Sequence, residues 1–149
     1  MSTPTSPTDR PQEGAADGKL QSATAAERAR VLLVEDDAAL RRYLGVVLRR
    51  AGYEVAEAAD GLEALRLALS SRVSLVVTDA VMPRLGGPEL CRLLRARTEY
   101  AALPVVLLTG LDVGKQKDNT APLVDARITK PVRTDELLSC LARLLGRAG

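Results

Sequence analysis

The chain of 149 residues is long enough for one domain with a core of ordinary size, because 46% of its residues are hydrophobic. Histidine is absent, which excludes a Ser-His-Asp or Cys-His catalytic site and removes the commonest nitrogen ligand of zinc. The net charge is only +2, and Lys and Arg do not alternate with aromatic side chains as a stacking surface requires. Nucleic acid is therefore not an expected partner.

Cysteine content and hydropathy predict where the protein resides. Cys91 and Cys140 fall at apolar-face spacing in separate predicted helices, as expected of small core residues in a reducing compartment. No apolar run approaches the length that spans a membrane, and the N-terminus lacks the apolar segment of a signal peptide. We expect a soluble cytoplasmic protein that does not bind membranes.

Residues 1–28 differ in composition from the rest of the chain. They are rich in Ser, Thr, Pro, Gly, Gln and acidic residues and contain little that a core can bury. Such a segment cannot offset the entropy lost on ordering. We therefore predict a disordered N-terminal tail over residues 1–28 and one folded domain over residues 29–149.

The folded region begins with a buried strand over residues 31–34, which three acids follow. Asp37, the last of these acids, is expected to cap a helix whose apolar residues recur at helical spacing and which stops at Gly52. A short strand over residues 53–58 comes next, and Asp60 then caps a second helix. The apolar face of this second helix is predicted to contain Leu62, Leu65 and Leu69.

A continuous apolar run over residues 73–79 predicts a third strand that is buried on both faces. A loop and a third helix follow, and residues 104–109 form a fourth buried strand. Gly, Asn and Pro interrupt residues 111–124, so the apolar period there is poor. A short fifth strand over residues 127–130 precedes a last amphipathic helix, which Thr134 is expected to cap.

Strands that alternate with helices at this spacing predict an α/β protein with a doubly wound, five-stranded parallel sheet and helices on both faces. In such sheets, ligands bind outside the carboxyl ends of the strands. Four of the five predicted strands end in polar side chains, which a parallel sheet brings to one edge. These side chains belong to Glu35, Asp36, Asp79, Thr109 and Lys130.

The residue types at this edge indicate a particular chemistry. Three carboxylates in one site repel each other by about 4 kcal/mol per pair at 4 Å and an effective dielectric of 20. They need a cation, and oxygen ligands without His or Cys favour Mg²⁺ or Mn²⁺. Lys130 adds a fixed positive charge, and Thr109 adds a hydroxyl donor. We predict phosphoryl transfer to Asp79, which stands alone while Glu35 and Asp36 are paired as ligands.

Four motifs over residues 31–147, VLLVEDD, VVTDAVMP, LLTG and ITKP, closely resemble the receiver domain of bacterial two-component response regulators. The resemblance implies a flavodoxin-like, CheY-like fold with strand order 2-1-3-4-5. It also implies that Asp79 accepts a phosphoryl group from a sensor histidine kinase or a histidine phosphotransfer protein. Phosphorylation then switches contacts with a downstream protein target, which the sequence does not name.

The resemblance also implies roles for the remaining residues of the site. Asp36 corresponds to the direct Mg²⁺ ligand of the acidic pair, and Thr109 and Lys130 correspond to the switch hydroxyl and the lysine. The Lys130-Pro131 peptide bond is expected to be cis. The metal ligands implied are Glu35, Asp36, Asp79 and the backbone carbonyl of Val81.

Two features depart from the pattern of this family. Arg127 occupies a position that is commonly aromatic, and residues 111–124 lack the usual helix-forming pattern, which bears on how phosphorylation is coupled to output. Val81 and Leu111 are apolar where polar side chains can position an attacking water, so we predict a slowly decaying aspartyl phosphate. Arg84 is interpreted as part of a solvated face.

Two other functions stay open at this point. One is a receiver-shaped interaction module that works without phosphate, which Arg127 favours and the complete acid, Thr and Lys set opposes. The other is a hydrolase of the haloacid dehalogenase type, although that family has a second Asp two residues after the nucleophile, where this chain has Val81. Few residues follow the last predicted helix, which leaves no room for a DNA-binding output domain, so the protein either acts by docking to a partner or is a fragment of a longer chain. We expect a stand-alone receiver that is a signalling switch rather than a conventional enzyme.

Overall fold

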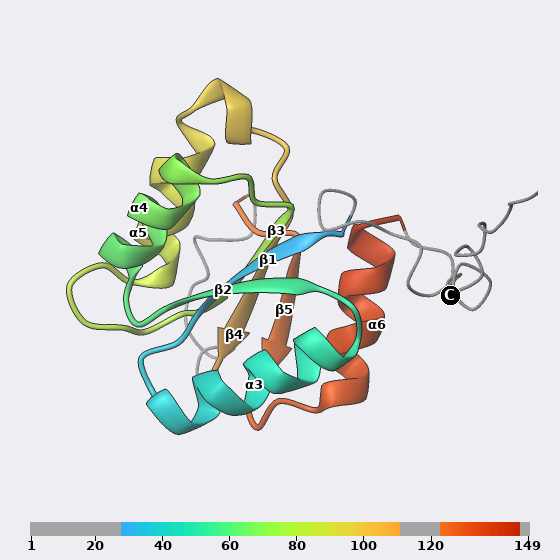
Figure 1. The fold of residues 1–149 in the computed structure, drawn as a ribbon. Coiled ribbons are helices and arrows are strands. Elements are labelled where there is room, and N and C mark those ends of the chain that lie inside the picture. Colours follow the sequence, from blue (N-terminus) through green and yellow to red (C-terminus); the bar gives the residue numbers. More distant parts are fainter. Residues whose placement is uncertain (1–27, 111–122, 147–149) are drawn as a thin grey trace, which may run out of the picture.

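The computed structural model describes residues 28–110 and 123–146. Within them, five parallel strands form one sheet in the order β2-β1-β3-β4-β5, with α-helices on both faces (Figure 1). This confirms the predicted fold class and strand order. The strands are β1 (Arg30–Val34), β2 (Glu54–Ala58), β3 (Leu75–Asp79), β4 (Val105–Thr109) and β5 (Ala126–Thr129). The helices are α3 (Ala38–Arg50), α4 (Gly61–Ser70), α5 (Gly87–Arg95) and α6 (Thr134–Leu144), with a 3-10 turn η2 (Thr98–Tyr100).

The core consists of two layers, one on each face of the sheet. Helices α3 and α6 cover one face, and helices α4 and α5 cover the other (Figure 1). Successive strand residues alternate between the layers, so Val31 and Leu33 of β1 pack under α3 and α6, whereas Leu32 and Val34 face α4 and α5. Two of the inner strands, β3 and β4, are buried along their whole length, as the continuous apolar runs predicted.

Three predicted helix boundaries are confirmed. The Asp37 carboxylate accepts hydrogen bonds from two backbone N–H groups of the first turn of α3, at 3.0 and 3.1 Å. Gly52, which follows α3, has a φ of 101°. The Asp60 carboxylate caps α4 by accepting a hydrogen bond from the backbone N–H of Glu63 at 2.9 Å.

The predicted apolar face of α4 is confirmed only for Leu65, which packs against the core layer of α4 and α5. The buried residues of α4 are small, namely Gly61, Ala64 and Ala68, whereas Leu62 and Leu69 are 42% and 47% exposed. The helix packs against β1, β2 and α5, and small residues allow this close approach. Apolar spacing alone therefore did not show that small residues, rather than all three leucines, form the buried face of this helix.

The predicted cap of the last helix is also wrong. Thr134 is the first residue of α6, and Arg133 holds the cap position without a capping side-chain hydrogen bond to the described residues. The first turn instead carries Asp135 and Glu136, whose negative charges favour the helix N-terminus.

The strand boundaries differ from the predicted ones by one or two residues. Strand β2 begins at Glu54, β3 at Leu75 and β4 at Val105, and β5 runs one residue earlier than predicted. Predictions for residues 1–27, most of the 111–124 segment and Leu111 lie outside the described residues. At the end of that segment, Leu123 and Val124 pack against the core layer of α4 and α5.

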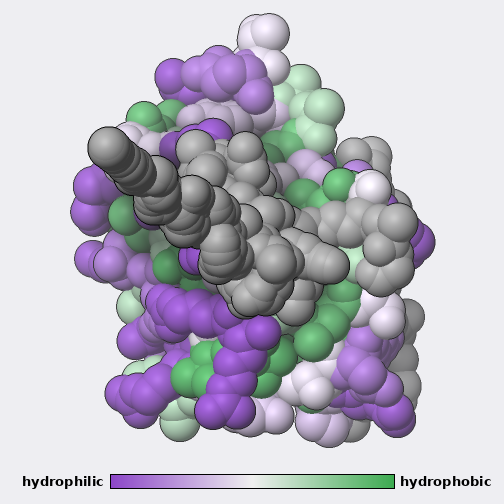
Figure 2. Space-filling view, turned by 45° about the vertical axis from the view of Figure 1, so that its right-hand side comes forward, coloured by the Kyte–Doolittle hydropathy of each residue, from purple (hydrophilic) through white to green (hydrophobic). Residues whose placement is uncertain are grey.

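The surface of the described part is mixed in polarity. Hydrophobic residues show between hydrophilic ones on the face drawn in Figure 2, where grey atoms cover part of the view. Among the helices of residues 28–110 and 123–146, none combines the length and the hydropathy needed to cross a bilayer.

Candidate functional site

Three carboxylates meet at the carboxyl edge of the sheet. Asp79 is the last residue of β3, and Glu35 and Asp36 directly follow the neighbouring strand β1. One oxygen from each of these side chains lies within 4.8 Å of the others. Glu35 and Asp79 are buried, at 1% and 7% exposed, while Asp36 is exposed. The sheet therefore brings the predicted acids together.

Lys130 joins two of these acids. Its Nζ lies 3.0 Å from Asp79 Oδ1 and 3.1 Å from Glu35 Oε1, although Lys130 and Glu35 are 95 residues apart in the chain. The backbone N–H of Lys130 donates to the carbonyl of Thr109 at 2.7 Å, which fixes the end of β5 beside β4. The Lys130-Pro131 bond is cis, as predicted.

Burial and charge compete at these side chains. Burial is the largest influence on Glu35 and raises its pKa, which the charge of Asp79 raises further and the hydrogen bonds from Asp37 N–H and from Lys130 partly offset. Burial alone lowers the pKa of Lys130, but hydrogen bonds and charges from Asp79 and Glu35 outweigh it and raise the pKa. The lysine is therefore held in its charged form.

The loop after β1 is held in place by two hydrogen bonds to Glu35. The backbone N–H of Asp37 donates to Glu35 Oε2 at 3.1 Å, and Nη1 of Arg41 donates to the carbonyl of Glu35 at 2.7 Å. The guanidinium of Arg41 also pairs with Glu57 on β2 at 3.6 Å. Arg41 therefore positions the acidic loop, while its charge is shared with Glu57 rather than directed at the three acids.

The charges of the site fit a bound divalent cation. Three carboxylates share one paired lysine, and all the donor atoms are oxygen, which is the ligand type that Mg²⁺ and Mn²⁺ prefer. A positive ion there relieves the repulsion that Lys130 does not offset.

The remaining predicted residues lie around this group. Thr109 ends β4 and is 4% exposed, and the strand register pairs Asp79 with Leu108, directly before it. Val81 lies in the loop between β3 and α5 and is 76% exposed. It lines a hollow of about 430 Å³ in this loop.

Sequence reasoning missed two features that shape this loop. Arg84, predicted to be solvated, forms an ion pair with the buried cap residue Asp60, and its Nε lies 3.1 Å from Asp60 Oδ2. Gly87 begins α5, and a Cβ there would lie 2.5 Å from the carbonyl oxygen of Asp79. Arg84 and Asp60 are 24 residues apart, and Gly87 approaches the backbone of Asp79 itself, so local spacing carries no signal for either contact.

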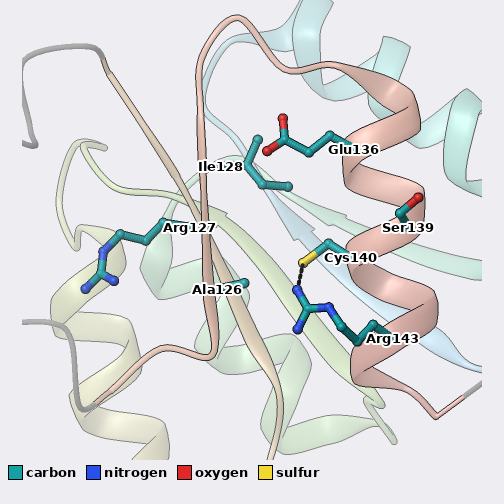
Figure 3. Close-up of a pocket in the computed structure, with 7 residues that line it drawn as sticks. All are labelled: Ala126, Arg127, Ile128, Glu136, Ser139, Cys140 and Arg143. Atoms are coloured by element: carbon teal, nitrogen blue, oxygen red, sulfur yellow. Dashed lines mark hydrogen bonds between the residues drawn. The ribbon is translucent and has the colours of Figure 1, made fainter.

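Arg127 lies on the opposite side of β5 from α6. Figure 3 shows its side chain pointing away from the hollow between β5 and α6, which Ile128 and Cys140 line. Cys140 is buried and not part of a disulfide, as predicted. Its Sγ accepts a hydrogen bond from Arg143 Nη2 at 3.6 Å. Arg127 is exposed, so it presents a cation at the position identified from the sequence as commonly aromatic in the resembled family.

Known proteins resemble this chain over most of its length. The family model described as "Response regulator receiver domain" matches residues 31–142. Response regulator MprA of Mycobacterium sp. (strain KMS) is 40% identical over 119 residues, which make up 79% of this chain and 51% of that protein. MprA of Mycolicibacterium vanbaalenii is 41% identical over the same length. The chain therefore spans about half the length of the curated relatives it matches.

Solved structures match the fold over nearly their whole length. A putative response regulator from Chloroflexus aurantiacus has a TM-score of 0.75 and 30% identity, covering 80% of this chain and 99% of that one. CheY4 of Vibrio cholerae has a TM-score of 0.71 and 32% identity, covering 78% and 98%. The receiver domain of sensor histidine kinase PA1611 from Pseudomonas aeruginosa, with magnesium in its active site cleft, has a TM-score of 0.73 and 29% identity, covering 80% and 98%. By sequence and by fold, this chain belongs to the response regulator receiver domain family.

Proposed function

We propose that Asp79 accepts a phosphoryl group from the phosphohistidine of a sensor histidine kinase or a histidine phosphotransfer protein, and that this switches contacts with a downstream protein. The observation that carries the proposal is the position of Lys130 Nζ, at 3.0 Å from Asp79 Oδ1 and 3.1 Å from Glu35 Oε1. A lysine held between a candidate nucleophile and a candidate metal ligand is suited to binding a phosphoryl oxygen.

The chemistry assigned to this chain is a single transfer. A carboxylate oxygen of Asp79 forms a bond to phosphorus while the bond from phosphorus to the donor imidazole nitrogen breaks, and that nitrogen keeps the electron pair. Lys130 offsets the negative charge on the phosphoryl oxygens, and the Thr109 hydroxyl donates a hydrogen bond to one of them. Catalysis then consists of positioning and charge neutralisation.

The acids of the site are assigned to a resident Mg²⁺, for which Mn²⁺ can substitute. Glu35, Asp36 and Asp79 would supply carboxylate oxygens, with Asp36 as a direct ligand. Val81 would supply its backbone carbonyl. Bound Mg²⁺ neutralises charge between the carboxylates and the incoming phosphoryl group.

The proposal is tested with small phosphodonors, so that no kinase has to be identified first. We expect the wild type, incubated with acetyl phosphate and Mg²⁺, to gain the mass of one phosphoryl group. Asp79→Asn should gain nothing, because an amide oxygen is a poor nucleophile. Omission of Mg²⁺ should slow the reaction, and beryllofluoride should bind the wild type alone. Failure of the folded wild type to react would contradict the proposal.

A second candidate function is an interaction module that does not depend on phosphate. The exposed Arg127 favours it, because the aromatic side chain that commonly responds to phosphorylation is missing from this position. A partner that binds the wild type and Asp79→Asn with equal affinity, with and without beryllofluoride, would identify this function.

Several wider assignments accompany the proposal. We assign residues 1–28 to a tail and 29–149 to the receiver domain, and the family match from residue 31 supports this division. A cytoplasmic location fits the two free, buried cysteines. A signalling switch without conventional enzyme activity, nucleic acid binding or membrane binding is the working assignment. Membership of the receiver family argues against the dehalogenase-type hydrolase.

The phosphorylated form is expected to decay slowly. Val81 is 76% exposed and apolar, so it offers no hydrogen bond to orient a water for attack on the phosphorus. Val81→Asn should shorten the lifetime of the aspartyl phosphate by about 3- to 10-fold, measured by loss of the mass increment after removal of the donor. A wild-type lifetime of seconds would contradict the expectation.

A further inference from the structure

The loop that follows Asp79 is anchored to the start of α4 by an ion pair. Arg84 donates from Nε to Asp60 Oδ2 at 3.1 Å, and its Nη2 contacts the same oxygen. The Asp60 side chain is 8% exposed, whereas that of Arg84 is 59% exposed. An exposed arginine is thus fixed by a buried carboxylate from a different part of the chain.

Asp60 is a rigid anchor because both of its oxygens are used. Oδ1 accepts the backbone N–H of Glu63 at 2.9 Å, and Glu63 Oε1 in turn accepts the backbone N–H of Ala59 at 2.8 Å. The arrangement resembles a capping box, except that Glu63 accepts from the residue before the cap rather than from the cap itself. The hydrogen bond from Glu63 N–H, followed by the one from Arg84, lowers the pKa of Asp60. Rotation of the carboxylate toward Arg84 alone would break the cap.

The backbone of the loop is held at the same place. The N–H of Gly61 donates to the carbonyl of Leu85 at 3.1 Å, and a Cβ on Gly61 would overlap that carbonyl. The backbone of Arg84 has a φ of 70°, which lies in the left-handed region that residues other than glycine rarely adopt. Such a conformation persists where its surroundings determine it, and these contacts to the start of α4 do so.

The part of the loop between Asp79 and this anchor is short. Met82 is buried in the core layer of α4 and α5, at 9% exposed, which leaves only Ala80 and Val81 between it and Asp79. The N–H of Gly87 donates to the carbonyl of Ala80 at 3.1 Å, on the other side of the loop. The placement of the Val81 backbone is therefore set by how firmly the rest of the loop is held.

We propose that Arg84 and Asp60 are positioning residues, which hold the 80–86 loop so that the Val81 backbone can complete the metal site beside Asp79. This inference rests on the proposed function, since it concerns the same site. Among the hydrogen bonds and ion pairs of the described residues, neither side chain pairs with Glu35, Asp36 or Asp79. Their effect passes through the loop backbone and should appear in metal affinity before it appears in chemistry.

The test measures Mg²⁺ binding directly, by calorimetry without a phosphodonor. Arg84→Ala and Asp60→Asn should each weaken Mg²⁺ affinity by about 3- to 10-fold, below the 10- to 100-fold typical of groups that contact a metal ligand. Asn still caps a helix, so α4 keeps its start. The Mg²⁺ affinity of the double variant should equal that of the more affected single variant, because the two side chains act as one unit and their losses do not add. Arg84→Lys should recover part of the affinity.

Arg97→Ala is the matched control, because Arg97 also forms an ion pair, with Glu99 at 3.5 Å, and its side chain is 48% exposed. It should bind Mg²⁺ like the wild type. With saturating Mg²⁺, Arg84→Ala should regain most of the wild-type rate of phosphorylation by acetyl phosphate.

The outcomes separate the two proposals. A wild type that neither binds Mg²⁺ nor takes up phosphate overturns the proposed function itself. A normal wild type with Arg84→Ala equal to Arg97→Ala overturns the positioning role alone, as do additive losses in the double variant. Should Asp60→Asn fail to fold, the Mg²⁺ affinities of Arg84→Ala, Arg84→Lys and Arg97→Ala decide whether Arg84 has the positioning role.

Discussion

The two ends of the sheet both carry buried or half-buried charges, but they balance them differently. At the carboxyl end, Lys130 pairs with Asp79 and Glu35 while Asp36 lies beside them. At the amino end, Arg95 at the end of α5 pairs with Asp125, which directly precedes β5. The guanidinium of Arg95 also donates to the backbone carbonyls of Tyr100, Ala101, Leu103 and Leu123.

Charge balance separates a structural cluster from a functional one in this molecule. In the Arg95 group at the amino end, one cation meets one carboxylate, and the other donors of Arg95 have carbonyl acceptors, so this group needs nothing from outside. At the carboxyl end, three carboxylates share one lysine, and the excess negative charge favours a metal ion and a phosphoryl group. The comparison predicts that changes at the two ends have different consequences.

The largest effect is expected at the carboxyl end, from Lys130→Met. Phosphorylation by acetyl phosphate should slow by at least about 100-fold, because the fixed charge beside Asp79 is lost. The free energy of unfolding should fall by about 1–3 kcal/mol, less than for a fully buried pair because the lysine side chain is 28% exposed. Mass spectrometry of the phosphorylated protein and urea unfolding measure the two effects.

The combination Lys130→Met with Glu35→Gln separates these effects. Removing the buried carboxylate of Glu35 along with its partner should restore part of the lost stability, since one of the two carboxylates that paired with Lys130 is then gone and only Asp79 keeps its charge without the lysine. It should not restore phosphorylation. Recovery of the phosphorylation rate in this double variant would show that Lys130 acts only through the fold.

The second largest effect is expected at the amino end, from Arg95→Met. Loss of the hydrogen bonds to the four carbonyls and to Asp125 should lower the free energy of unfolding by about 2–4 kcal/mol, measured by urea unfolding. The rate of phosphorylation by acetyl phosphate should stay within about 2-fold of the wild type while the protein is folded. A loss of Mg²⁺ affinity in this variant would break the comparison, because it would couple the two ends.

The acidic site was predictable from the sequence, whereas the arginine contacts were not. Parallel strands end at one edge, so residues at strand ends such as Asp79 and Lys130 can be placed together without knowing a single contact. Arg95 reaches Leu123 and Asp125 across 28 and 30 residues, and most of its acceptors are backbone carbonyls. Every residue has such a carbonyl, so no side-chain pattern marks the partners of this arginine.

The errors on α4 and α6 have the same origin. Hydropathy spacing finds an apolar stripe, but whether the leucines or the neighbouring alanines face the sheet depends on how close the helix lies to its neighbours. Likewise, Thr134 suits a cap position by type, but it is the first residue of α6 and Arg133 holds the cap position. In both helices the residue type alone did not fix the position.

The smallest effect concerns pH and again contrasts the two ends. The pKa of Glu35 is raised above 4.5 in the folded state, mainly by burial, so between 4.5 and that raised value the folded protein binds more protons than the unfolded chain. Its contribution to stability is therefore greatest at low pH and is lost as the pH rises through the folded pKa. Without Mg²⁺, the difference in unfolding free energy between the wild type and Glu35→Gln should move in favour of the wild type as the pH falls from about 7 toward 4.5. The same slope should appear in an Arg95→Met background, because distant sites add independently, and a slope that changes there would mean that the amino end also sets the charge state of the acids.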